Sequence, residues 1–291
     1  MIYPKVSIVV PAYNEEKTIE GCIQSLLGLT YPKNKYEILI VDNNSNDKTA
    51  KIIQEYDISY LKETKPGPSA ARNLGIKKAK GEIIAFIDAD CVVDKNWLKN
   101  LVKGFDNPKI VGSGGKIKVF KPLKMIEKYA DRRLYNQKQF IQGIGGLLPF
   151  LATVNCADKA EVFKKIGLFD PSFTSAEDND FGWRIHALGY KFSYVSSAIV
   201  FHQMSKSFIE ILKKQFIYGR DNMRLLFKHQ DILKKESRLS LFQLIERDFA
   251  KFPHWLKKIF RGNFLMPFLD FLIYLSFRLG MIYQLFKIKI H

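Results

Sequence analysis

The amino-acid sequence predicts an α/β protein with a mostly parallel central sheet flanked by helices. In the first third of the chain, short apolar runs alternate with segments whose apolar residues recur at helical spacing. The apolar runs are rich in Val and Ile and end at a proline or a polar cluster, which is typical of buried strands. Strands that alternate with helices form right-handed βαβ units, and such strands pair in parallel.

The expected elements of this first region follow one another with short connections. Val6–Val10 is a strand stopped by Pro11, and Ser69 can cap a helix after the break at Pro66–Pro68. In full, we predict strands at residues 6–10, 36–41, 58–61 and 82–87, and helices at residues 15–27, 49–56 and 69–79.

Beyond residue 110 the pattern is less regular. The sequence predicts a strand at 111–120, a helix at 123–140, a loop at 143–146, short strands and a helix at 150–200, and basic helices at 205–262. We therefore expect one domain at residues 1–205, with halves at 1–110 and 111–205. A helical extension, first basic and then amphipathic, follows at residues 206–291.

The net charge of +17 is concentrated toward the C-terminus. Residues 201–291 contain 17 Lys and Arg against 7 Asp and Glu, whereas residues 1–200 contain 29 against 22. A basic segment of this kind favours an anionic partner: a membrane surface, a phosphorylated substrate or nucleic acid. The sequence has no helix-turn-helix, zinc-finger or RNA-binding aromatic signature, so we do not expect nucleic acid to be the partner.

The three cysteines, Cys22, Cys91 and Cys156, are far apart and form no Cys-x-x-Cys pair. This spacing predicts neither a disulfide framework nor a zinc site, and it fits a reducing compartment. The N-terminus lacks the basic, apolar and small-residue layout of a signal peptide. We expect the catalytic part to be cytoplasmic.

Polar clusters follow three of the four strands expected in the first region. They are Tyr13-Asn14-Glu15, Asp42-Asn43-Asn44 and Asp88-Ala89-Asp90. Ligands of parallel sheets bind beyond the carboxyl ends of the strands, so the clusters are expected to meet in one crevice. The alternative is that each cluster is an ordinary solvated turn.

Asp88 and Asp90 are expected to bind a divalent cation. Side chains two residues apart in an extended segment point to the same side, so both carboxylates can approach one ion. Oxygen ligands suit Mg²⁺ or Mn²⁺, which keep open positions for substrate phosphates. Asp-x-Asp alone occurs in many surface turns, but here it ends the apolar run Ile83–Ile87, where unused charges are costly.

Two further sites are candidates for chemistry. Glu177, Asp178 and Asp180 lie within four residues, and one of them could take a proton from a hydroxyl group. The alternative is an acidic helix N-terminus stabilised by the helix dipole. His202 follows an apolar strand candidate and could be a further metal or phosphate ligand, although a lone histidine is more often a packed or surface residue.

Five segments occur in the order and spacing of family 2 glycosyltransferases, which the chain resembles over roughly residues 4–205. They are Val6–Glu15, Val41–Asp47, Ala70–Gly75, Asp88–Asp90 and Glu177–Asp178. The resemblance implies the GT-A nucleotide-diphospho-sugar transferase fold, with 1–110 as the nucleotide-binding half and 111–205 as the acceptor and catalytic half.

The resemblance also implies roles in donor binding. Pro11, Tyr13 and Glu15 resemble positions around the nucleotide base and ribose, and Asp42 resembles the acid that pairs with the base. Arg72 stands where the family has a residue near the nucleotide or its phosphates. The implied donor is a UDP- or GDP-sugar.

For the reaction itself, the resemblance implies that Asp90 binds Mn²⁺ or Mg²⁺ and that Asp88 is shared between the metal and the ribose. His202 resembles a later histidine that in some members reaches the metal or the diphosphate. Asp178 matches the general base of inverting members, with Glu177 beside it. Asn155–Asp158 lies where members shape the acceptor side.

The expected activity is therefore inverting transfer of a sugar to an acceptor hydroxyl, in a lipid-linked or cell-surface glycan. Processive members carry Gln-x-x-Arg-Trp, whereas this chain has only Gln215–Arg220 with a different spacing, which argues against a processive polymerase.

A nucleotidyltransferase is one alternative function, but the acidic segment Ala12–Glu16 stands where that class has a basic phosphate loop. A non-catalytic nucleotide-sugar-binding scaffold on the membrane is another. No Gly-x-Gly-x-x-Gly follows the first strand, which excludes a dinucleotide-dependent oxidoreductase.

The C-terminal residues 264–286 are apolar and aromatic, interrupted by Asp270, Ser276, Arg278 and Gln284. A broad apolar face next to a basic segment predicts a helix that lies on anionic lipid, peripheral on the cytoplasmic face of the cell membrane. The alternatives are a helix packed on the body of the protein or on a partner subunit, as in a homo-oligomer, and a membrane span.

Overall fold

The computed structural model describes residues 3–122, 127–129, 131, 136–143, 147–203, 207–237 and 265–290. The chain forms two compact units. The first comprises Met1–Gln142, Pro149–Ser172 and Glu177–Met204, and the second comprises Gly143–Leu148, Phe173–Ala176 and Ser205–His291. The separate roles expected for the domain at 1–205 and for the extension at 206–291 stay predictions.

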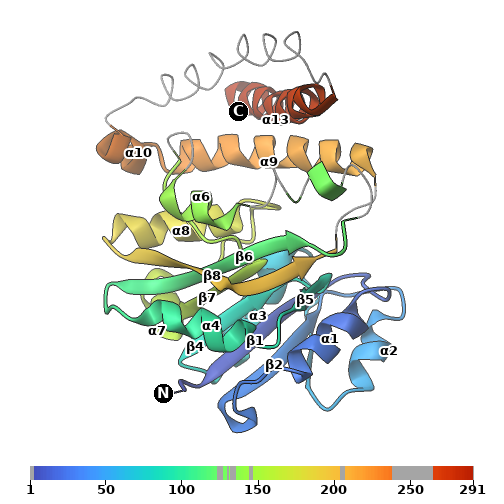
Figure 1. Ribbon diagram of the computed structural model, residues 1–291. Helices are drawn as coiled ribbons and strands as arrows, with labels where there is room; N and C mark the ends of the chain where they lie inside the picture. The colour runs from blue at the N-terminus through green and yellow to red at the C-terminus, as the bar shows by residue number, and fades with distance from the viewer. Residues whose placement is uncertain are drawn as a thin grey trace. The chain divides into compact units, whose positions relative to one another are not determined.

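The first unit is built around an eight-stranded sheet with the strand order β3-β2-β1-β4-β7-β6-β8-β5 (Figure 1). The strands are β1 Val6–Ala12, β2 Tyr36–Asp42, β3 Ser59–Lys62, β4 Ile83–Ile87, β5 Cys91–Val93, β6 Ile110–Val119, β7 Asn155–Lys159 and β8 Lys191–His202.

The strand directions divide the sheet into two parts. The four N-terminal strands β1 to β4 pair only in parallel with one another, as the βαβ pattern predicts. Strand β7 then joins β4 and β6 in antiparallel pairs, β6 and β8 are parallel, and β5 is antiparallel to β8. The predicted α/β class with a central sheet between helices is confirmed.

Helices cover both faces of the sheet. On one face, α1 Ile19–Leu27, α2 Thr49–Gln54 and α4 Trp97–Leu101 pack on the strands around Ile8, Ile40 and Ala85. On the other face, α3 Pro68–Lys78, α7 Ala160–Ile166 and α8 Glu177–Ala187 pack around Val9, Leu39 and Phe86. Two short 3₁₀ helices, η1 Lys33–Lys35 and η2 Val102–Phe105, complete the connections.

The observed elements differ from the predicted ones in three places. Helix α1 begins at Ile19 rather than at residue 15, because residues 15–18 form a turn that bonds to the loop after β2. Strand β5 and helix α4 were not predicted, since three and five residues carry little periodicity. Of the helix expected at 123–140, residues 127–129 and 131 are helical and α6 Gln137–Gln142 forms a separate short helix, while residues 123–126, 130, 132–135 and the loop residues 144–146 lie outside the described residues.

The second unit contains α9 Phe208–Lys228, α10 Gln230–Ser237 and α13 Leu265–Ile290. Helices α9 and α13 lie side by side (Figure 1). Their backbones approach closely, because a Cβ on Gly219 would meet the Phe277 carbonyl oxygen at 1.8 Å and one on Gly280 would meet that of Phe216 at 1.9 Å. The helices expected at 205–262 are confirmed over 208–237, and residues 204–206 and 238–264 lie outside the described residues.

Candidate functional site

The loops that follow β1 and β2 are tied together at the carboxyl end of the sheet. The Asn14 backbone N–H donates to Ser45 Oγ at 3.0 Å, and the Glu15 backbone N–H donates to Thr49 Oγ1 at 2.7 Å. Asn14 adopts a positive φ of 55°, a conformation that asparagine tolerates better than most residues. These bonds, between residues 31 and 34 positions apart, explain why the two polar clusters form one rim of the site.

Asp42 lies at the end of β2 and is buried at 1% exposure. Its carboxylate accepts hydrogen bonds from the Ser45 backbone N–H at 3.0 Å and from the Tyr60 hydroxyl at 3.2 Å. Ala12 is the register partner of Asp42, and the next residue, Tyr13, exposes 58% of its surface. A fixed acid and an open aromatic ring at neighbouring strand ends suit a planar polar ligand such as a nucleotide base.

Arg72 connects the third polar cluster to helix α8. Its Nη2 donates to Asp88 Oδ1 and its Nη1 donates to Glu177 Oε1, each at 2.7 Å. Arg72 and Glu177 are buried, at 4% and 5% exposure. Burial alone would lower the pKa of Arg72, but the Asp88 and Glu177 carboxylates raise it, so the guanidinium stays charged.

The packing of α3 explains how Arg72 reaches both acids. A Cβ on Gly75 would meet Val9 Cγ1 at 2.4 Å, so the helix rests directly on β1 at that point. The sequence resemblance placed Arg72 near the nucleotide or its phosphates. That role stays a prediction, and in the structure the guanidinium is engaged by two carboxylates, one at a strand end and one at a helix N-terminus.

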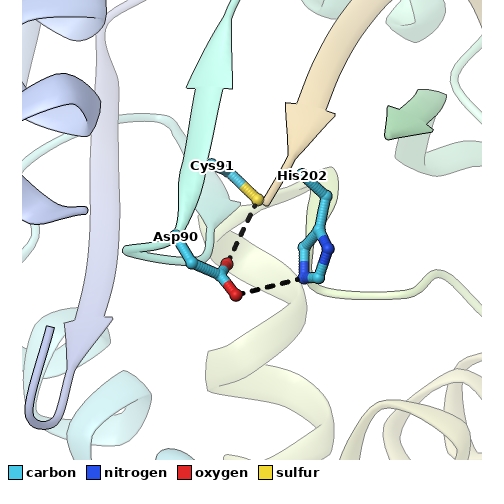
Figure 2. Close-up of side chains that lie close together, drawn as sticks. All are labelled: Asp90, Cys91 and His202. Carbon is cyan, nitrogen blue, oxygen red and sulfur yellow. Dashed lines mark hydrogen bonds and ion pairs between the residues drawn. The ribbon is translucent and has the colours of Figure 1, made fainter. Parts of the chain in front are cut away.

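Asp90, Cys91 and His202 come together where β5 and β8 pair (Figure 2). Cys91 and His202 are register partners, and His202 Nε2 lies 3.3 Å from Asp90 Oδ2. The Cys91 thiol donates to Asp90 Oδ1 at 3.5 Å. The potential ligand atoms of the three residues all lie within 4.8 Å of one another. The pairing of β5 with β8 therefore brings the acid of the Asp-x-Asp motif beside the distant histidine.

The donor set of this cluster fits a divalent cation. A carboxylate and an imidazole are available from Asp90 and His202. Asp88, which was also expected to bind the ion, follows β4 and is not part of this three-residue cluster, and its Oδ1 is bound to Arg72. Burial, with help from Asp90 and Asp88, holds the pKa of the Cys91 thiol well above its usual value. The thiol is thus protonated in the metal-free site.

Asp178 lies in the first turn of α8 and keeps part of its surface exposed. Burial and the adjacent Glu177 raise its pKa to about 7, while Arg72 and the backbone N–H groups of Asn179 and Thr153 oppose the rise. A carboxylate that ionises near neutral pH and remains accessible can act as a general base.

Two residues near these groups were not predicted as parts of the site. Cys91 follows the Asp-x-Asp motif directly, but only its pairing with His202 shows that it borders the same cluster. Asp158 was noted only within a segment on the acceptor side, and the structure buries it at 3% exposure in a cavity that Asp178 also lines.

The sequence model of the family described as "Glycosyl transferase family 2" matches residues 7–167. The chain belongs to glycosyl transferase family 2. It is a glycosyltransferase, and the predicted family and GT-A fold are confirmed.

Two named glycosyltransferases resemble the chain over most of its length. Glycosyltransferase AglE of Haloferax volcanii is 30% identical over 266 residues, which cover 89% of this chain and 86% of that protein. A Methanococcus voltae enzyme is 28% identical over 230 residues, or 74% of this chain and 71% of that protein. Its name is dolichyl N-acetyl-alpha-D-glucosaminyl phosphate 3-beta-D-2,3-diacetamido-2,3-dideoxy-beta-D-glucuronosyltransferase.

Solved structures support the fold. The mannosyltransferase PcManGT from Pyrobaculum calidifontis, in complex with GDP-Man and Mn²⁺, superposes with a TM-score of 0.72 at 18% identity and covers 99% of this chain and 88% of that chain. Staphylococcus aureus TarS 1-349 in complex with UDP-GlcNAc has a TM-score of 0.55 at 19% identity, covering 96% of this chain and 90% of that chain.

Proposed function

We propose that this family 2 glycosyltransferase transfers a sugar from a UDP- or GDP-sugar to an acceptor hydroxyl, with inversion at the anomeric carbon and with Mn²⁺ or Mg²⁺ as cofactor. The observation that carries the proposal is the double ion pair of Arg72. By binding Asp88 and Glu177 at once, Arg72 links the strand end of the Asp-x-Asp motif to the helix turn that carries Asp178. An inverting transferase needs a site for its leaving group and a base for its acceptor. The double ion pair of Arg72 connects the proposed leaving-group site at Asp88 to the helix turn of the proposed base, Asp178.

The donor is proposed to bind along the carboxyl ends of β1, β2 and β4. Pro11, Tyr13 and Glu15 would contact the base and ribose, and Asp42 would pair with the base. The carboxylate of Asp42 is held by Ser45 and Tyr60, so it needs little reorganisation on binding. Asp88 would contact the ribose, and Arg72 would act beside the phosphates by fixing Asp88.

Asp90, Asp88 and His202 are proposed to hold the cation. When bound, a divalent ion there would neutralise the charge that develops on the departing nucleoside diphosphate. His202 is the register partner of Cys91 in the β5–β8 pair, and this pairing keeps its Nε2 near Asp90 before any ion binds.

Asp178 is proposed to take the proton of the acceptor hydroxyl while the hydroxyl oxygen attacks the anomeric carbon. Its pKa of about 7 leaves a large ionised fraction at neutral pH and makes the carboxylate basic enough to accept the proton. Glu177 serves this step as a neighbour, since its negative charge raises the pKa of Asp178 while its own carboxylate is bound to Arg72.

The acceptor is proposed to be a lipid-linked or cell-surface glycan. The Methanococcus voltae relative is named for a dolichyl phosphate acceptor, and a Staphylococcus epidermidis relative, 25% identical over 84% of this chain, is named poly-beta-1,6-N-acetyl-D-glucosamine synthase. The lipid group in the first of these names agrees with the basic and apolar character of the C-terminal unit.

Helices α9 and α13 are proposed to hold the enzyme on the cytoplasmic face of an anionic membrane. Residues Phe268–Ile288 of α13 are long and apolar enough to cross a bilayer, with a mean hydropathy of 1.3. Leu279, Tyr283 and Phe286 are exposed, whereas Arg278 is buried and stacks on Tyr274. The exposed lysines of the same unit, Lys213, Lys214, Lys228, Lys234 and Lys235, can meet lipid head groups.

A thermal-shift panel of nucleotide sugars with and without Mn²⁺ tests the donor and metal assignments together. A ligand that binds the native state raises the unfolding temperature, so one UDP- or GDP-sugar should do so and only with the metal present. Asp90→Ala should remove the metal-dependent rise, and the exposed Asp57→Ala should keep it. A rise that is equal with and without Mn²⁺ would rule out the proposed metal site.

A further inference from the structure

Asp158 is a buried acid in the middle of the sheet. It lies on β7, where its register partners are Ile84 of β4 and Gly112 of β6. Alternation along the strand places its side chain on the same face as Cys156, which belongs to the core cluster around Phe86 and Phe181. The absence of a side chain at Gly112 makes room for it, since a Cβ there would meet Asp158 Oδ1 at 2.5 Å.

The surroundings of Asp158 do not compensate a charge. Among the described residues, Oδ1 is buried without a hydrogen-bond partner, and no ion pair of Asp158 is formed. Burial raises its pKa to about 8. An isolated carboxylate in such a place is strongly unfavourable, so the side chain is neutral at neutral pH and carries a proton that it can donate.

This proton faces a small cavity that Asp158 shares with Asp178. The cavity is lined by Leu151, Thr153, Cys156, Asp158, Phe169, Asp178, Phe181, Gly182, Ile185 and Phe192. Its volume is about 10 Å³, roughly the space for one water molecule, and a buried water needs two or more polar partners. Asp158, Asp178 and Thr153 supply these partners.

The charged groups around Asp158 are few. Asp178 approaches the cavity from α8, and the Cys156 thiol lies on the same strand. The elements β4, β6 and β8 present Ile84, Gly112 and Phe192, which carry no charge. The carboxylate of Asp178 is thus the one strong acceptor in this described cavity wall for the proton of Asp158.

We propose that Asp158 is a positioning residue for the base: its neutral carboxyl group donates a hydrogen bond to the Asp178 carboxylate through one buried water in the shared cavity. This inference rests on the proposed role of Asp178. In the transfer step, the acceptor hydroxyl gives its proton to Asp178 as the new glycosidic bond forms and the nucleoside diphosphate departs. Asp158 keeps its own proton throughout and fixes the orientation of Asp178.

The protonation state can be measured independently of turnover. In the full-length protein labelled with ¹³C at aspartate carboxyl groups, Asp158→Asn identifies the Asp158 resonance by its loss. We expect that resonance to remain at its protonated position at pH 7. A resonance that titrates near pH 4, as exposed aspartates do, would overturn the proposal.

Kinetics of two variants test the positioning role. Asp158→Asn keeps a donor of similar shape, so kcat should stay within about threefold of the wild type. Asp158→Leu has no donor, so kcat should fall by about tenfold or more while the KM for the donor sugar is unchanged. The proposal would be overturned if folded Asp158→Leu had the kcat of the wild type, or if both variants lost the same amount of kcat. If Asp158→Leu does not fold, the Asp158 carboxyl resonance and the kcat of Asp158→Asn still test the proposal.

Failure of this inference can be told from failure of the proposed function. If Asp178→Asn abolishes turnover but Asp158→Leu does not reduce it, only the positioning role of Asp158 is wrong. If Asp178→Asn turns over normally, the base assignment is wrong and the positioning role is overturned with it.

Discussion

Arg72 donates a hydrogen bond of 2.7 Å to Glu177, a residue 105 positions later in the chain. The contact fixes the N-terminal turn of α8, because Glu177 is its first residue and Asp178 its second. The same guanidinium holds Asp88 at the end of β4. The arrangement places one buried cation between the motif that would bind the donor and the residue that would activate the acceptor.

Replacing Arg72 should therefore damage both stability and turnover. Arg72→Ala leaves the buried Glu177 carboxylate without its partner, and breaking such a pair costs about 3 to 5 kcal/mol of the free energy of unfolding. We expect urea denaturation to show this loss. Lys51→Ala, on the exposed surface of α2, should change stability by less than about 0.5 kcal/mol. A wild-type unfolding free energy in Arg72→Ala would contradict the account.

The rate of transfer should rise with pH around neutrality. The proposed base Asp178 must be ionised to accept a proton, and its pKa is raised to about 7. The value of kcat/KM at saturating Mn²⁺ should accordingly increase as pH passes through about 7 and then level off. Asp178→Asn should lower turnover by a factor of about 10² to 10⁴ above pH 7 and should remove the rise with pH. A flat profile between pH 5 and 8 in the wild type would argue that another group acts as the base.

His202 and Asp90 should both contribute to metal affinity. His202→Ala removes the imidazole that lies 3.3 Å from Asp90, so the dissociation constant for Mn²⁺, measured by calorimetry, should rise at least tenfold. Asp106→Ala, at an exposed position, is the control and should leave the Mn²⁺ affinity unchanged. Unchanged Mn²⁺ affinity in His202→Ala would remove His202 from the site.

Asp158 should make folding less favourable as pH rises. Its folded pKa of about 8 exceeds its ordinary value of 3.8, so the folded state keeps a proton that the unfolded chain releases. The free energy of unfolding should decrease with pH between about 4 and 8, by a few kcal/mol in total for this group. In urea denaturation, the free energy of unfolding of Asp158→Asn should exceed that of the wild type by more at pH 8.5 than at pH 5. Asp57→Asn, at the surface, should show the same pH dependence as the wild type.

The apolar surface of α13 should be needed for membrane binding. Changing Leu279, Tyr283 and Phe286 together to serine removes exposed apolar groups and should reduce sedimentation with anionic vesicles several-fold. Leu188→Ser, in an exposed position of the first unit, should not reduce it. If the triple variant sediments with vesicles as the wild type does, α13 does not provide the contact.

The first half of the fold could be predicted because its signals are local. The strands β1 to β4 are continuous apolar runs, and the helices between them have their own periodicity and breaks. The antiparallel insertion of β7 between β4 and β6 could not be predicted, since it depends on pairing between residues such as Phe86 and Cys156 that are distant in the sequence. Strand β5 is too short to carry a pattern.

In the candidate site, too, the features with a local sequence signal could be predicted and those that depend on tertiary packing could not. The acids at the strand ends were predicted from their position, and the structure brings Asp90 and His202 together as the ligand hypothesis requires. The engagement of Arg72 by two acids, and the burial of Asp158 opposite a glycine, follow from tertiary packing alone. Their roles in donor binding, metal binding and catalysis stay predictions that the variants above can test.

The most direct test of the central claim is the configuration of the first sugar product. With the donor selected by thermal shift and with Mn²⁺ present, proton NMR at early times distinguishes the anomers before they equilibrate. Inverting transfer to an acceptor, or to water, predicts a product with the anomeric configuration opposite to that of the donor, and none with Asp90→Ala. A product that retains the donor configuration would contradict a single displacement with Asp178 as the base.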